Sequence, residues 1–110
     1  MEAAAKKPYR GISMEGGIAT WYTKMTRKDL SEFERLARQL AADLQPGARV
    51  LEIAPGPGYL SVALGKLGRF KITGLDISQS FVQIASQYAK REGVTARFIH
   101  GSAPARGWLI

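Results

Sequence analysis

The apolar segment Val50–Ala54 (VLEIA) is followed at once by the loop Pro55–Gly58 (PGPG), and this junction limits the possible folds more than any other part of the chain. A nearly continuous apolar run of this length is typical of a parallel strand that is covered on both faces. Glycine lacks a Cβ, so Gly56 and Gly58 allow a sharp bend and let a ligand approach the main chain. Because open α/β sheets bind ligands at the carboxyl ends of their strands, this loop is the first candidate site.

The rest of the hydrophobic pattern alternates between helix and strand periods. Apolar residues three and four positions apart predict an amphipathic helix over 28–44, before the first strand. After the glycine loop the pattern predicts a helix over 59–67, a strand over 70–77, a helix between Ser78 and Gly93, and a strand over 95–100. A helix followed by this βαβαβ order predicts an α/β fold with a parallel sheet and right-handed crossovers.

Length and composition indicate one small domain, because the chain has 110 residues and an ordinary share of apolar residues. We expect an irregular N-terminal segment over 1–27, since proline and glycine interrupt any periodicity there, then a domain over 28–103 and a tail over 104–110. The formal charge is +7, but the basic residues are dispersed, so we expect no specific nucleic-acid partner. No run suits a membrane span or a secretion signal, which makes the cytoplasm the expected location.

A carboxylate, Asp76, ends the second predicted strand 20 residues after Gly56. Such a group at the carboxyl edge of a sheet can accept hydrogen bonds from the two hydroxyls of a ribose. Glu52, inside the first strand, suits a ligand with a cationic amine, because an acidic group offsets the desolvation of that amine. A dinucleotide site has no need of this carboxylate, and Ser61 stands where its third small residue is expected. The alternative is that the glycines only form a turn and that Asp76 only caps a helix.

Two strings of residues carry a resemblance to a known family. Leu51–Ser61 reads LEIAPGPGYLS and Thr73–Ser78 reads TGLDIS. With these motifs the chain resembles the class I S-adenosylmethionine-dependent methyltransferases, in particular those of the small-molecule type. The resemblance covers about residues 20–103, and it implies a Rossmann-like fold with S-adenosylmethionine as the cofactor.

The resemblance also implies which residues hold the cofactor. The first motif would wrap its methionine part, Asp76 would bind the ribose hydroxyls and Ile77 would pack on the adenine. Residues after the third strand would meet the adenine edge, although the family more often has Asp or Asn where Ser102 stands. The aromatic Tyr22 would lie over the cofactor or substrate, or alternatively in the core. The implied cofactor-binding residues are Glu52, Ala54, Pro55, Gly56, Gly58, Asp76, Ile77, Ser102, Ala103 and Tyr22.

The resemblance stops near the end of the chain. The family's sheet continues with further strands after the third, whereas residues 104–110 do not resemble the family. We therefore expect the N-terminal, cofactor-binding half of a Rossmann-like sheet, truncated after the third strand. Without a fourth strand, Val50–Ala54 would present an unpaired apolar edge, and such edges invite pairing with another chain. A homo-oligomer through this edge, such as a dimer, is the expected assembly.

The expected activity is methyl transfer to a small-molecule acceptor. The alternative is a catalytically inactive module that binds the cofactor or self-associates, and whether the chain alone is an active enzyme stays open. No catalytic residue can be named, since His100 is more simply a hydrogen-bonded residue at a strand end. No group of residues has metal-ligand spacing, so no metal is expected. A fragment of a dinucleotide-dependent oxidoreductase and a basic nucleic-acid-binding domain are weaker alternatives.

Overall fold

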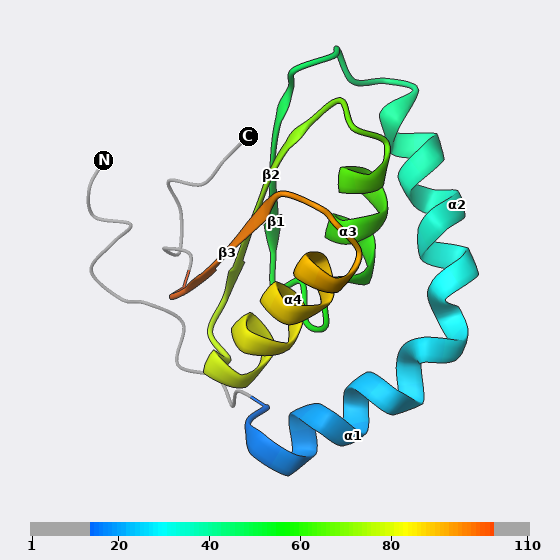
Figure 1. Cartoon of the computed structure of the whole chain (residues 1–110). Coiled ribbons are helices and arrows are strands. Elements are labelled where there is room, and N and C mark those ends of the chain that lie inside the picture. Colours follow the sequence, from blue (N-terminus) through cyan, green and yellow to red (C-terminus); the bar gives the residue numbers. More distant parts are fainter. Residues whose placement is uncertain (1–13, 103–110) are drawn as a thin grey trace.

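The computed structural model describes residues 14–102, and these form helices and strands in the predicted α/β order (Figure 1). The elements are α1 (Gly16–Thr26), the 3-10 turn η2 (Arg27–Asp29), α2 (Leu30–Ala41), β1 (Arg49–Ile53), α3 (Tyr59–Lys66), β2 (Lys71–Asp76), α4 (Gln79–Arg91) and β3 (Ala96–His100). The predicted βαβαβ order after an N-terminal helix is thus confirmed. Ala103 and the tail over 104–110 lie outside the described residues.

The sheet has three parallel strands in the order β1-β2-β3. Ile53 lies opposite Leu75, and Asp76 lies opposite His100, so the carboxyl ends of the strands meet at one edge. Among the described residues β1 pairs only with β2, which leaves its other side as a sheet edge. Helices α2, α3 and α4 lie on the same side of the sheet in Figure 1.

The core lies between the sheet and these helices. Small side chains let α2 approach α3 closely, and Val50 and Ala96 pack against the same cluster from the sheet. Its buried members are Ala37, Ala41, Ala63, Leu64 and Ile72. On the other face no described helix covers the strands, and Ile53 and Ile99 are 48% and 40% exposed. The prediction that the first strand is covered on both faces is therefore wrong for the part of the chain that the structure describes.

The N-terminal segment is less irregular than the sequence predicted, because α1 occupies Gly16–Thr26. Packing overrides the two glycines at its start: Ala19 is fully buried. The Thr23 hydroxyl donates to the Ala19 carbonyl at 2.8 Å, and the Thr26 hydroxyl donates to the Tyr22 carbonyl at 2.8 Å. Among residues 14–102 no helix is long and apolar enough to cross a membrane.

Candidate cofactor site

The loop between β1 and α3 requires its two glycines for different reasons. Gly58 precedes α3 with φ 89°, and a Cβ there would meet the Ala85 Cβ at 2.9 Å, so a side chain would push α3 away from α4. Gly56 has φ 58°, but a Cβ there would meet nothing within 4 Å. Ala54 also has a positive φ of 56°, a conformation that residues with a side chain rarely adopt. The space around Gly56 therefore lets a ligand approach the main chain.

Asp76 joins the glycine loop to the start of α4. Its side chain is only 6% exposed, and its Oδ2 atom accepts a hydrogen bond from the Gly56 amide at 2.9 Å. Its Oδ1 atom accepts one from the Ser78 amide at 2.9 Å. A carboxylate oxygen has more than one lone pair, so each atom can also accept from a ligand hydroxyl. The structure brings Asp76 to the predicted loop, and its contact with a ribose stays a prediction.

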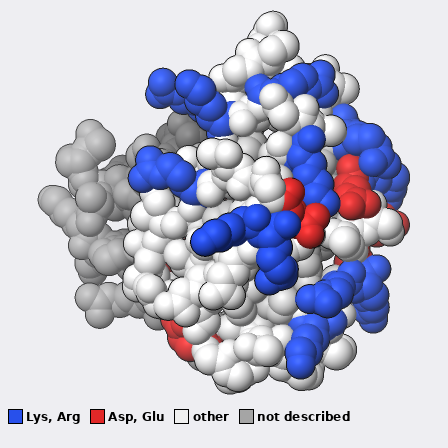
Figure 2. All heavy atoms as spheres, in the orientation of Figure 1, with Lys and Arg blue, Asp and Glu red and all other residues white. Residues whose placement is uncertain are grey.

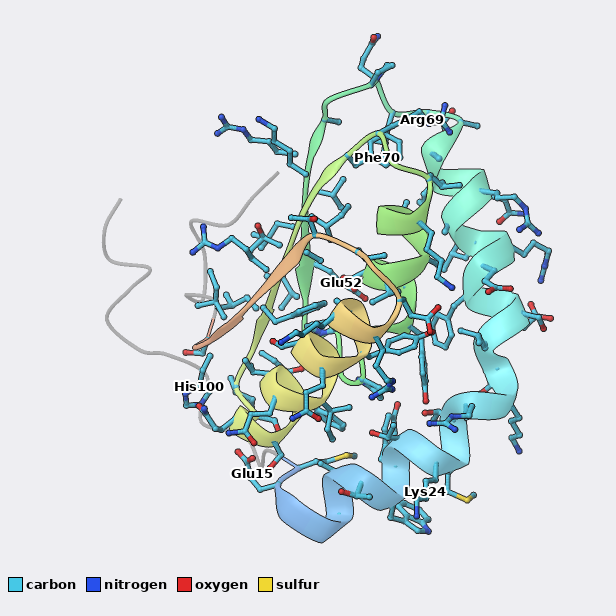
Figure 3. The ribbon with its side chains drawn as sticks, in the orientation of Figure 1. Glu15, Lys24, Glu52, Arg69, Phe70 and His100 are labelled. Carbon is cyan, nitrogen blue, oxygen red and sulfur yellow. The ribbon has the colours of Figure 1, made fainter. Side chains whose placement is uncertain are left out.

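Glu52 belongs to β1 and lies in the interior of the view in Figure 3, where its side chain meets Ser61 of α3. The Ser61 hydroxyl donates a hydrogen bond to its Oε1 atom. Burial raises the pKa of the Glu52 carboxyl, the Ser61 hydrogen bonds oppose this shift, and the nearby Asp76 carboxylate adds to it. Because burial disfavours the charged form, a cationic group beside Glu52 would gain a partner that is already poorly solvated.

A cavity of about 200 Å³ brings several of the predicted residues together. It lies where α1, α2, the end of β1 and the glycine loop meet. Its lining includes Tyr22, Glu52, Ala54, Pro55 and Gly56 from the predicted set, together with Thr26, Phe33, Pro57, Tyr59 and Leu60. Glycine and proline on one side and aromatic rings on the other form a partly apolar recess with one carboxylate, which suits an organic cation.

Sequence reasoning missed the aromatic residues on the helix side of this cavity. Tyr59 is 5% exposed, its hydroxyl donates to the Thr23 carbonyl at 2.6 Å, and its ring lies 5.5 Å from the Phe33 ring. Phe33 had looked like an ordinary member of the apolar helix face, and Tyr59 like the first residue of a helix. For Tyr59 the signal was its position directly after the glycine loop, whereas Phe33 is brought to the cavity only by the packing of α2.

The other described residues of the predicted site, Gly58, Asp76, Ile77 and Ser102, do not line this cavity. Gly58 is buried where α3 begins, and Ile77 follows Asp76 at the start of α4. His100 Nε2 lies 3.1 Å from the Ile77 carbonyl oxygen, consistent with the hydrogen-bonded role expected for this histidine. Ser102 is half-buried just after β3, and Ala103 lies outside the described residues.

Residues 50–107 match the family model of a methyltransferase domain, which is more than half of the chain. The chain belongs to this methyltransferase domain family. The match also includes the first residues of the segment 104–110, which we had expected to lie outside the family resemblance.

This methyltransferase domain matches only part of the length of its curated relatives. A ribosomal protein L11 methyltransferase of Thermus thermophilus is 44% identical over 75 residues, which are 67% of this chain and 29% of that protein. A 23S rRNA (uracil(747)-C(5))-methyltransferase of Pyrococcus horikoshii is 37% identical over 52% of this chain and 14% of that protein. The chain thus spans less than a third of either relative.

Solved structures support the fold and the cofactor. A Methanococcus maripaludis structure has a TM-score of 0.72 over 87% of this chain and 46% of that one, and at 20% identity it shows the fold alone. A Thiobacillus denitrificans S-adenosylmethionine-dependent methyltransferase in complex with S-adenosylhomocysteine is 32% identical, with a TM-score of 0.52 over 69% of this chain and 29% of that one. Together with the family match, this neighbour indicates S-adenosylmethionine as the cofactor, as predicted.

The comparisons correct the predicted partners of this methyltransferase domain. The relatives are named for methylating a ribosomal protein and an rRNA, so the prediction of a small-molecule acceptor without a nucleic-acid partner is wrong. The error has a physical source, because the cofactor motifs determine the cofactor and say nothing about the acceptor, which other parts of such a protein contact. The homo-oligomer was predicted together with the small-molecule acceptor, and we do not propose it for this chain.

Proposed function

We propose that this chain is the cofactor-binding part of a methyltransferase that transfers the methyl group of S-adenosylmethionine to a macromolecule, either a protein or an RNA of the ribosome. One observation supports the cofactor site above all others. Tyr22, Glu52 and Gly56, far apart in the sequence, line one cavity, and the Gly56 amide is bonded to Asp76 at 2.9 Å. A turn without a ligand would need neither the recess nor the half-buried carboxylate of Glu52.

Each part of the cofactor has a suitable neighbour in this proposal. The ammonium group of its methionine part would lie toward Glu52, because burial raises the pKa of this carboxyl and a cation would stabilise its charged form. The main chain at Gly56 leaves room for close approach, and Asp76 would accept from the ribose hydroxyls. The adenine would then lie beside Ile77, with Ser102 and Ala103 at its edge.

The chemistry of transfer places modest demands on the described residues. When bound, the cofactor supplies a sulfonium whose methyl group is readily transferred to a nucleophile. The chain's own task would be to hold the cofactor in one orientation and to keep water from the recess. The aromatic rings of Tyr22 and Tyr59 lie where they can do this. No described residue is assigned as a general base.

The macromolecular acceptor rests on the relatives and agrees with the charge of the chain. The formal charge is +7, and Figure 2 shows lysine and arginine side chains scattered over the visible face rather than gathered in one patch. A surface of this kind attracts polyanions without sequence specificity, and this attraction weakens as the salt concentration rises. Ribosomal components are found in the cytoplasm, which we propose as the location of this protein.

Calorimetry with S-adenosylmethionine, S-adenosylhomocysteine and NAD tests the cofactor site. We expect the first two to bind and NAD not to bind. Gly56→Ala should weaken binding at least about tenfold, because the new Cβ occupies the approach to the main chain. Gly68→Ala is the matched control, since Gly68 also has a positive φ and open space around its Cβ position but lies at the end of α3. Equal binding by both variants would contradict the proposed site.

A second assay separates an enzyme from a module that only binds. The chain is incubated with S-adenosylmethionine carrying a radioactive methyl group and with ribosomal protein, ribosomal RNA or a pool of small-molecule nucleophiles. Label in the protein or RNA fraction supports the proposal, and label only in the small-molecule pool contradicts it. Cofactor binding without any transfer would favour the catalytically inactive module.

A further inference from the structure

The segment just before α1 is attached to the start of α4, more than 60 positions away in the sequence. The Glu15 Oε1 atom accepts a hydrogen bond from the Ser80 amide at 2.9 Å, and its Oε2 atom accepts one from the Gln79 amide at 3.2 Å. The Gly16 amide donates to the Ser80 hydroxyl at 2.7 Å, and the Ser78 hydroxyl donates to the Met14 carbonyl. We call these contacts between Met14–Gly16 and Ser78–Ser80 the latch.

The latch is favourable for an elementary reason. The first amides of a helix have no partner within that helix, and its N-terminus carries a partial positive charge. Ser78 already caps α4 by accepting from the Phe81 amide at 3.0 Å. Glu15 adds a carboxylate that accepts from two further amides. Figure 3 shows Glu15 where the chain enters α1, next to the beginning of α4.

The latch determines where α1 lies, and α1 forms one wall of the cofactor cavity. Tyr22 and Thr26 from α1 line that cavity, and the Tyr22 ring meets the Phe81 ring of α4 edge-on at 5.7 Å between centroids. At its other end α1 continues through the short η2 turn into α2. The helix that carries Tyr22 is therefore attached at one end through the η2 turn and at the other through the latch.

The cavity has room for only part of a cofactor, and α1 is the wall that covers this part. Ligands of drug-like size occupy sites of about 300–1,000 Å³, whereas the cavity beside Tyr22 measures about 200 Å³. Besides the latch, α1 is attached to the domain by the Tyr59 hydroxyl, which donates to the Thr23 carbonyl at 2.6 Å, and by the contact between the Tyr22 and Phe81 rings. A movement of α1 about η2 would widen this recess, and it would open the latch.

We propose that Glu15 is a positioning residue that holds α1, and with it Tyr22, closed over the bound cofactor. This inference rests on the proposed cofactor site. It assigns to Glu15 a role that none of the sequence motifs indicates. Glu15 touches α4 and not the cavity, so it acts through the position of α1. Loss of the latch should let α1 open more often and release the cofactor faster.

The rate of S-adenosylhomocysteine release tests the proposal directly. Trp21 lies on α1 next to Tyr22 and is 59% exposed, and Trp108 is the other tryptophan of the chain. A Trp108→Phe background therefore makes Trp21 fluorescence a reporter of α1 in stopped-flow displacement experiments. We expect Glu15→Ala to raise the release rate about tenfold and Glu15→Gln, which keeps the size of the side chain, to raise it about threefold.

Two controls distinguish the latch from a general loss of stability. Glu32→Gln removes an exposed carboxylate of α2 that pairs with Arg35 and should leave release unchanged. Ala89→Gly lowers stability inside α4 by about 1 kcal/mol without touching the latch, so it should leave release unchanged too. If Ala89→Gly accelerates release as much as Glu15→Ala does, Glu15 is only a structural cap and the proposal is overturned.

Hydrogen exchange supplies a readout that does not depend on activity. In the parent, bound S-adenosylhomocysteine should slow exchange at the amides of Gly16, Gln79 and Ser80, and this protection should be lost in Glu15→Ala. Unchanged protection together with unchanged release in both Glu15 variants overturns the latch alone. A parent chain that binds no S-adenosylhomocysteine overturns the proposed cofactor site, and the latch proposal with it.

Discussion

Helices α3 and α4 each follow the carboxyl end of a strand, at the same edge of the sheet, but their first turns are completed differently. The start of α3 has Gly58 with φ 89° and no side chain that caps it. The start of α4 is capped by the Ser78 hydroxyl and further covered by the Glu15 carboxylate. Equivalent positions in the topology thus have side-chain caps at α4 and none at α3, and below we call these the closed and the open helix start.

The difference shows how a small sheet can combine access with rigidity. At α3 the main chain itself is exposed to a ligand, and side chains are kept away by the glycines. At α4 side chains occupy the amides, so this end fixes α1 and the cavity wall. Asp76 links the two, because one of its oxygens accepts from Gly56 and the other from Ser78. The predictions below test this division, starting from the largest expected effect.

Gly58→Ala should be the most damaging change at the open helix start. Alanine in this left-handed conformation costs about 1–2 kcal/mol, and its Cβ would meet the Ala85 Cβ at 2.9 Å. Such overpacking adds about 1–3 kcal/mol. Urea unfolding should show a loss of about 3 kcal/mol in the free energy of unfolding. A loss no larger than that of Gly68→Ala, which has open space around it, would show that α3 does not need close contact with α4.

Asp76→Asn should weaken both helix starts together. An amide side chain cannot accept from the Gly56 and Ser78 amides with two oxygens, so one hydrogen bond to a charged group is lost. We expect the free energy of unfolding to fall by about 2 kcal/mol, and S-adenosylhomocysteine binding to fall at least about tenfold. Chemical unfolding and calorimetry measure the two effects. If stability falls while affinity is retained, Asp76 only joins the loops and does not contact the ribose.

The sequence could predict the glycine loop and Asp76, but it could not predict helix α1 or the role of Glu15. The glycine loop and Asp76 are local signals, since each follows directly from the strand before it. The same glycines misled the prediction for 1–27, because Gly16 and Gly17 read as chain breakers although α1 is stabilised by packing. Glu15 gave no signal at all: the α4 amides that its carboxylate binds lie beyond residue 77, and only the folded chain brings them together.

On the α3 side, Glu52→Gln should change both the binding of S-adenosylhomocysteine and the pH dependence of the stability of the chain. Because the folded-state pKa of Glu52 is raised, its protonated form favours folding, and this contribution is lost as pH rises from the ordinary 4.5 through the raised pKa. The variant should therefore be more stable than the parent at pH 7, with the difference shrinking below pH 4.5. Thermal unfolding across this range measures the effect.

The same variant should bind S-adenosylhomocysteine about tenfold more weakly at pH 7, because the ligand's ammonium loses a charged partner. Glu34→Gln is the matched control, since it removes a carboxylate of α2 that does not line the cavity. Identical pH profiles for parent and Glu52→Gln would show that the carboxyl is well solvated in the folded chain. Unchanged affinity would place the ammonium elsewhere.

His100→Ala should have the smallest effect, on the α4 side. His100 Nε2 lies 3.1 Å from the Ile77 carbonyl at an exposed position, so losing this contact should cost about 0.5–1 kcal/mol. We expect S-adenosylhomocysteine affinity to fall no more than about threefold, measured by calorimetry against Arg97→Ala on the same strand. A much larger fall would mean that the loop at Ile77 is held by β3 rather than by Ser78 and Glu15. The closed start of α4 would then depend on the sheet, and the contrast with α3 would reside in strand pairing instead of helix capping.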